Sequence, residues 1–173
     1  MQRLFFSLKF SSVQQQQLLP YQQQALSACP GAKAVDSDNL HLTLFFLGQT
    51  DSEQQQRLIS AAQLINTPHF SLTLDTLSCF AKPKILYLAP SAIPAELTTL
   101  QQQVAALCMA EGFSDIHDNY RPHISLARHA VCDAALRQPV VPLTLQVSEF
   151  ALYQSAQCDG RLQYRPVYHF MLI

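Results

Sequence analysis

The stretch His41-Leu42-Thr43-Leu44 returns later in the chain as His123-Ile124-Ser125-Leu126. In each copy an imidazole and a hydroxyl stand two residues apart, so on a β-strand both point to one face and the aliphatic residues point to the other. The copies begin 82 residues apart (123 − 41) in a chain of 173 residues. This repetition predicts two related halves that each bring one histidine and one hydroxyl to a shared site.

The segments around the two copies indicate a mixture of strands and helices. Apolar residues recur at strand or helix spacing, and several segment ends carry Gly or Pro. Pro20 lies inside the first expected helix and predicts a kink or a break there. We expect strands at 4–10, 40–47, 70–77, 85–89, 123–128, 140–153 and 162–173, and helices at 13–28, 52–65 and 94–110. The pattern predicts an α+β fold of two sheets with outer helices, in one domain over residues 1–173.

The composition restricts the class of partner and the compartment. The chain has 11 basic and 12 acidic residues, whereas a protein that grips a long nucleic acid usually has a strong basic excess. A small anionic substrate or a nucleic-acid end needs only a local positive pocket and stays possible. Five cysteines without CxxC spacing predict buried free thiols in a reducing cytoplasm. No apolar run approaches the roughly 18 residues of a membrane span, so we expect a cytoplasmic protein without a membrane partner.

The repeated residue types suit acid–base chemistry. Two imidazoles that titrate near neutral pH can supply a general base and a general acid, and two hydroxyls can donate to one anion. These groups suffice to open a phosphodiester without a metal. The alternative is a structural role for each histidine, but burying such groups unpaired would cost roughly 1–3 kcal/mol each. Phe45 shares the expected face of His41 and could stack a base or simply pack.

With its flanking residues, the motif pair resembles a known family. Asn39 precedes the first copy and Phe46-Leu47-Gly48 follows it, while Pro122 precedes the second copy. In this the chain is similar to the two-histidine (2H) phosphoesterase superfamily, and within it to the bacterial and archaeal RNA 2′,3′-cyclic phosphodiesterases, historically called 2′-5′ RNA ligases. Ser125 departs from the threonine usual in that family. The resemblance implies two pseudo-symmetric lobes, each an antiparallel sheet with outer helices, and an active-site cleft between them.

The same resemblance implies a reaction and a set of roles. The substrate would be an RNA 3′ end or a nucleotide with a 2′,3′-cyclic phosphate, which is hydrolysed to a 2′-phosphate, and reversal would make a 2′-5′ linkage. His123 would accept a proton from water and His41 would donate one to the leaving O3′. Thr43, Ser125 and Arg128 would bind the phosphate. A monomer that uses no metal and no cofactor is expected.

Strand parity raises a difficulty for Arg128. On a regular strand its side chain points away from His123 and Ser125, so it reaches the cleft only if the strand ends or bulges near Ala127. Arg121 shares the face of His123 and is the reserve candidate for the phosphate.

Other functions stay open from the sequence. One is a non-catalytic module that binds an RNA end or a nucleotide. Another is a 2H phosphodiesterase for a different substrate, such as a 2′-5′ oligonucleotide or an ADP-ribose cyclic phosphate. His117, His123 and His129 recur every six residues, but no acidic or cysteine ligand joins them at a standard zinc spacing.

Overall fold

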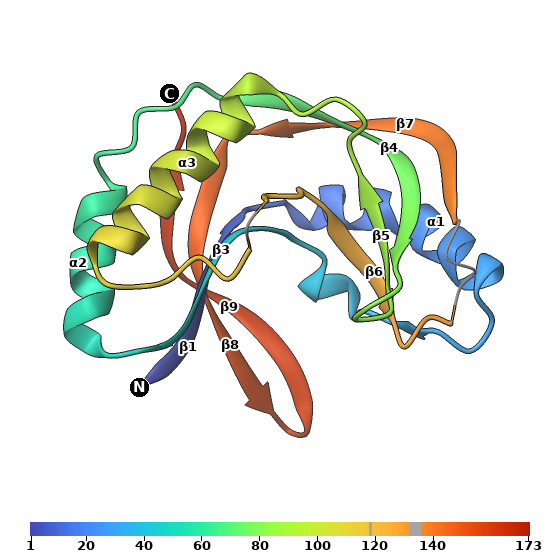
Figure 1. The fold of residues 1–173 in the computed structure, drawn as a ribbon, viewed down its shortest axis with the longest axis horizontal. Helices are drawn as coiled ribbons and strands as arrows, with labels where there is room; N and C mark the ends of the chain where they lie inside the picture. Colours follow the sequence, from blue (N-terminus) through green and yellow to red (C-terminus); the bar gives the residue numbers. More distant parts are fainter. Residues whose placement is uncertain (118, 132–135) are drawn as a thin grey trace.

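The computed structural model of the protein describes residues 1–117, 119–131 and 136–173 (Figure 1). The described residues form nine strands, three α-helices and one 3₁₀ turn at Ser37–Asn39. The strands are β1 (Gln2–Leu8), β2 (Lys33–Ala34), β3 (Leu42–Thr50), β4 (Phe70–Phe80), β5 (Ile85–Ala89), β6 (Ile124–Arg128), β7 (Arg137–Val147), β8 (Glu149–Cys158) and β9 (Arg161–Met171). The helices are α1 (Ser12–Ala28), α2 (Ser52–Ala62) and α3 (Ala95–Ala110).

The strands form two antiparallel halves that meet at the motif strands. The strand order is β7-β4-β5-β6-β3-β1-β8-β9, with β2 paired to β6. One half is β6-β5-β4-β7 and the other is β3-β1-β8-β9, and they join through the register pair Leu42 and Ile124. The expected α+β class is confirmed. The two expected sheets are joined into one nine-stranded sheet, because β3 and β6 pair with each other.

The helices cover the two halves separately. In Figure 1, α1 lies beside β5 and β6, while α3 packs against β3 and α2 packs against α3. Ser11 caps α1 and Asp51 caps α2, each in a reciprocal capping box with a glutamine three residues later. α1 continues through Pro20, so the expected break is absent. Leu18 before the proline and Ala25 after it are both completely buried, so packing supports the helix on both sides.

The segment 140–153 is where the sequence prediction fails most clearly. It was expected as one strand, but β7 ends at Val147 and β8 begins at Glu149. β7 pairs with β4 and β8 pairs with β1, so the chain passes from one half of the sheet to the other at this point. β2 was not expected, since two residues carry no periodic signal.

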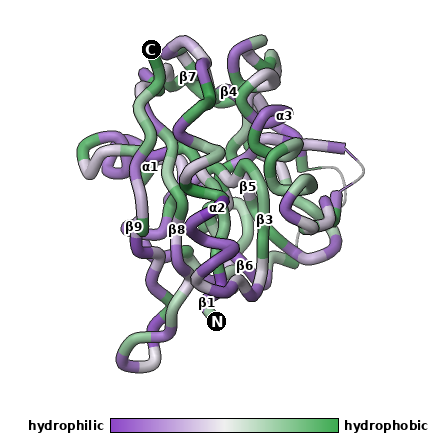
Figure 2. Tube along the Cα trace, turned by 90° about the vertical axis from the view of Figure 1, so that its left-hand side faces the viewer, coloured by the Kyte–Doolittle hydropathy of each residue, from purple (hydrophilic) through white to green (hydrophobic). Residues whose placement is uncertain are grey.

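Buried leucine and phenylalanine side chains fill the core between sheet and helices, and Figure 2 shows hydrophobic segments there. The hairpin of β8 and β9 extends away from this core in both views. Cys79, Cys108 and Cys158 are free thiols, as expected, but only Cys108 of the three is buried, and Cys29 is disulfide-bonded, which corrects the prediction for that residue. Cys132 lies outside the described residues. Over the described part of the chain, no helix is both long and apolar enough to cross a membrane.

Candidate active site

The two copies of the motif lie side by side at the junction of the sheet halves. Leu42 and Ile124 face each other in antiparallel register, and both are completely buried. The histidine and hydroxyl residues next to each of them are half-buried. The structure therefore brings these four side chains together: His41, Thr43, His123 and Ser125.

Both imidazoles are held in the same way. His41 Nδ1 lies 2.7 Å from the carbonyl oxygen of Asn39, and His123 Nδ1 lies 2.7 Å from that of Arg121. A carbonyl oxygen only accepts, so Nδ1 carries the proton and the neutral ring has its lone pair on Nε2. Thr43 donates its hydroxyl to His41 Nε2 at 2.8 Å, while His123 Nε2 has no partner among the described residues. The second imidazole thus has a free lone pair.

Burial and neighbouring charge lower the pKa of both imidazoles. Desolvation is the main cause at His41, with the charges of His123 and Arg128 adding to it, and the pKa falls to about 4. Desolvation also lowers the pKa of His123, and the charges of His117 and Arg128 contribute. Both rings are therefore neutral at pH 7 in the free protein. Each can accept a proton there, and one of them has to gain a proton before it can act as an acid.

Aromatic rings surround each histidine. The His41 ring lies 5.1 Å from that of Phe5 and 4.9 Å from that of Tyr164, between centroids. The His123 ring lies 5.0 Å from that of Phe80 and 5.5 Å from that of Tyr87, edge to face in both cases. These rings come from strands far apart in the sequence, so no local pattern predicted them. They limit the rotation of the imidazoles and provide the desolvation.

A β-bulge directs Arg128 toward the two histidines. On β6 the register shifts at Leu126, because Leu86 pairs with Ala127 and Tyr87 pairs with Ser125. Leu126 and Ala127 are both buried, so Arg128 returns to the face of Ser125. Its charge acts on His41 and on His123 alike. The parity difficulty is thereby resolved for Arg128.

A second bulge corrects the prediction for Phe45. On β3 the register shifts at Leu44, since Phe6 pairs with Phe45 and Ser7 pairs with Thr43. Phe45 is 4% exposed and belongs to the hydrophobic core, so its expected place on the face of His41 is wrong. Phe46 is 46% exposed instead, and it occupies the position equivalent to Arg128, five residues after the histidine.

Gln22 of α1 stabilises the bulge on β6. Its side chain is 7% exposed, and Nε2 donates to the carbonyl oxygens of Leu126 and Val35, at 2.8 Å each. We expect Gln22→Leu to lower the free energy of unfolding by about 1–3 kcal/mol, because Nε2 no longer binds these carbonyls. Urea unfolding of this variant and of Gln24→Leu, an exposed change on the same helix, measures the effect. Equal stability of the two variants would contradict this role.

Two polar side chains that position the site, those of Asn39 and Tyr120, carried no predicted role. Asn39 donates from Nδ2 to Leu162 O at 2.7 Å and accepts from the backbone N–H of Tyr164, which ties β9 to the segment before β3. The hydroxyl of Tyr120 donates to Thr43 O at 3.0 Å. Asn39 did stand out as part of the motif context, but its long-range partners are visible only in the structure.

Comparison with known proteins places the chain in a family. The model of a family described as "2'-5' RNA ligase superfamily" matches residues 16–158. The chain belongs to this superfamily. A superfamily member from Escherichia coli (strain K12), named RNA 2′,3′-cyclic phosphodiesterase, is 30% identical over 166 residues, which are 96% of this chain and 94% of that protein.

Solved structures of other members have the same fold. The crystal structure of E. coli LigT complexed with 3′-AMP superposes with a TM-score of 0.88 at 30% identity, covering 99% of this chain and 98% of that one. The complex of E. coli LigT with ATP gives 0.85 at 29% identity, over 99% and 98% of the two chains. E. coli LigT therefore binds nucleotides.

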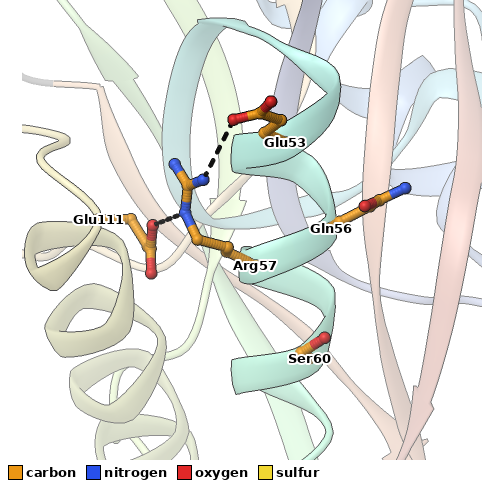
Figure 3. Close-up of a pocket in the computed structure, with 5 residues that line it drawn as sticks. All are labelled: Glu53, Gln56, Arg57, Ser60 and Glu111. Atoms are coloured by element: carbon orange, nitrogen blue, oxygen red, sulfur yellow. Dashed lines mark hydrogen bonds and ion pairs between the residues drawn. The ribbon is translucent and has the colours of Figure 1, made fainter.

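Two hollows lie on the surface of the protein. One, of about 310 Å³, is lined by His123 and by residues of β4, β5 and β7. The other, of about 530 Å³, lies between α2 and the end of α3 and contains none of the motif residues (Figure 3). There Arg57 is already paired with Glu111 at 2.7 Å and with Glu53 at 3.8 Å. Among the described residues, no group of three His, Cys, Asp or Glu side chains could hold a metal ion.

Proposed function

We propose that this protein hydrolyses 2′,3′-cyclic phosphates at RNA 3′ ends, or on nucleotides, to 2′-phosphomonoesters by metal-independent acid–base catalysis. The observation that carries the proposal is the pair of imidazoles at the junction of β3 and β6, each fixed through Nδ1 so that Nε2 is the reactive nitrogen. The activity named for the E. coli relative and the 3′-AMP complex of LigT support the same reaction.

The proton transfers follow from the difference between the two histidines. His123 Nε2 has a free lone pair, so it takes a proton from the attacking water, and the water oxygen bonds to phosphorus. The bond from phosphorus to O3′ breaks, and O3′ takes a proton from Nε2 of protonated His41. Binding of the anionic substrate favours protonated His41, because a nearby negative charge raises the pKa of an imidazole. The product is a 2′-phosphate, and in ligation a 5′-hydroxyl replaces the water while the two histidines keep their roles.

Thr43, Ser125 and Arg128 bind the phosphate oxygens in this mechanism. The two hydroxyls stand two residues after their histidines, and Arg128 supplies a positive charge on the same face. Preorganised donors of this kind stabilise negative charge as it develops in the transition state. Phe45 is buried and takes no part in this mechanism.

We expect Arg128→Gln to lower kcat/KM for a cyclic phosphate about 10–100-fold. A charge-assisted hydrogen bond to the phosphate contributes roughly 1.5–3 kcal/mol, which the glutamine only partly replaces. Steady-state kinetics measure the effect, and Arg128→Lys, which keeps the charge, should recover part of the loss. A glutamine variant with unchanged kcat/KM would exclude contact between Arg128 and the phosphate.

The function is tested directly with an RNA oligomer that ends in a 2′,3′-cyclic phosphate, in the presence of EDTA. The proposal expects quantitative conversion to a 2′-phosphate. Binding without turnover would instead make the protein an RNA-end-binding module, and turnover that EDTA abolishes would contradict the metal-independent mechanism. A panel with a 2′-5′-linked dinucleotide and ADP-ribose 1″,2″-cyclic phosphate separates this substrate from its rivals.

A further inference from the structure

The hollow beside His123 has the chemistry of a binding site. Arg121 and Arg137 line it together with Thr76, Ser78 and Tyr87, and none of the described residues in its lining is acidic. Its volume of about 310 Å³ lies at the lower end of the range for small-ligand pockets. The whole chain has a net charge of −1, so two guanidinium groups make the described lining of this pocket a local exception.

The two arginines are available to a ligand. Within the described parts of the chain, neither Arg121 nor Arg137 forms an ion pair or a side-chain hydrogen bond, in contrast to Arg57 in the other hollow. Asp75 precedes Thr76 on β4, but its carboxylate binds the backbone N–H of Ser91 at 2.7 Å and the hydroxyl of Ser91. Positive charge in the pocket is therefore not neutralised by a described neighbour.

A row of paired residues joins this pocket to the second motif. Arg137 on β7 pairs with Ser78 on β4, Ser78 pairs with Tyr87 on β5, and Tyr87 pairs with Ser125 on β6. Directly paired residues of adjacent strands share a face of the sheet. Arg137 therefore lies on the face of Ser125, three strand spacings or roughly 14 Å away along the sheet.

Tyr87 occupies the middle of this row. Its ring stacks on that of Phe80 with 4.1 Å between centroids, and it lies edge to face with His123. Aromatic rings in a positively charged groove are how single-stranded nucleic acids are commonly bound, with bases stacked and phosphates paired to basic side chains. A basic residue, a stacked ring and the hydroxyl of Ser125 thus follow one another along this row.

We propose that the pocket is a second phosphate subsite, in which Arg137 and Arg121 bind the phosphodiester of the nucleotide that neighbours the reacting phosphate. The inference rests on the proposed function. It makes the substrate an RNA chain rather than a single nucleotide. The phosphodiester comes either from the same strand, upstream of the cyclic end, or from the strand whose 5′-hydroxyl attacks in the ligation direction.

The test compares two substrates that differ by one phosphodiester. One is a 2′,3′-cyclic mononucleotide without a 5′-phosphate, and the other is a dinucleotide that ends in the same cyclic phosphate. We expect the wild type to prefer the dinucleotide in kcat/KM, and Arg137→Gln to reduce this preference about tenfold, as does Arg121→Gln. Arg57→Gln removes the same charge on α2, outside the pocket lining, and should leave the preference unchanged. Thermal melting confirms that each variant is folded.

A ligation assay with a 5′-hydroxyl dinucleotide distinguishes the two sources of the phosphodiester. If the arginine variants lose ligation but keep the preference in hydrolysis, the subsite serves the incoming strand. The inference is overturned if neither variant changes the preference or the ligation rate. If the wild type hydrolyses neither substrate, the proposed function fails, and binding of a fluorescent dinucleotide to wild type and Arg137→Gln then decides on the subsite alone.

Discussion

Replacing His41 or His123 with alanine should lower kcat for cyclic phosphate hydrolysis about 10²–10⁴-fold, because each histidine carries one proton transfer in the proposed mechanism. Without His123 no neighbouring base takes the proton of the attacking water. Without His41 the O3′ leaves as an alkoxide. Single-turnover hydrolysis of an RNA oligomer with a cyclic end measures the chemical step for both variants.

The control for these variants is His69→Ala, which removes an exposed imidazole just before β4. It should keep wild-type kcat. We also expect the double variant to lose little beyond the more damaged single variant, since two groups that act in one step are not additive. Activity within tenfold of wild type in either single variant would contradict the assignment of that histidine.

Local spacing was enough to predict the chemical groups of the site. A histidine and a hydroxyl two residues apart share a strand face whatever the rest of the fold does, so His41 with Thr43 and His123 with Ser125 followed from the sequence. The classes of the major elements followed equally, because hydrophobic periodicity is also local.

The sequence did not predict where the side chains along a strand switch from one face of the sheet to the other. A bulge is defined by the partner strand, and the extra residue at Leu44 or Leu126 carries no mark of its own. This is why Phe45 was expected on the wrong face and why Arg128 presented a parity difficulty. Gln22 lies more than 100 residues from Leu126, whose carbonyl it binds, so its role needed the structure.

The pocket beside His123 shows the same limit. Its row of paired residues spans 59 positions of sequence (137 − 78), and these residues become neighbours only through strand order: Ser78, Tyr87, Ser125 and Arg137. Their row across β7, β4, β5 and β6 depends on three independent registers. The sequence therefore predicted the chemistry of single residues. It did not predict the arrangement that we propose for binding a chain of nucleotides.

The pH dependence of kcat/KM should show the depressed pKa values of the two histidines. The reaction needs one imidazole protonated and one neutral, and kcat/KM reports the free enzyme. The pKa of His41 is about 4 and that of His123 is also below its usual 6.5, so above pH 6.5 the singly protonated form is a minority that shrinks with rising pH. A cyclic phosphodiester keeps one charge over this range. We therefore expect kcat/KM to fall about tenfold per pH unit above pH 6.5, while kcat, which reports the complex, declines only at higher pH.

The Arg128→Gln variant provides an internal check, because the positive charge of Arg128 lowers the pKa of both histidines. Its loss should move the decline of kcat/KM to higher pH as well as lower the maximum, whereas a purely steric change would leave the profile in place. Protonation of buried imidazoles also costs stability, so the melting temperature should fall as the pH drops from 6.5 toward 4, and circular dichroism at each pH separates unfolding from titration. A kcat/KM that rises steadily to pH 8.5 would show that no histidine donates a proton. His123 could then still act as the base, but the role of His41 in protonating O3′ would have to be withdrawn.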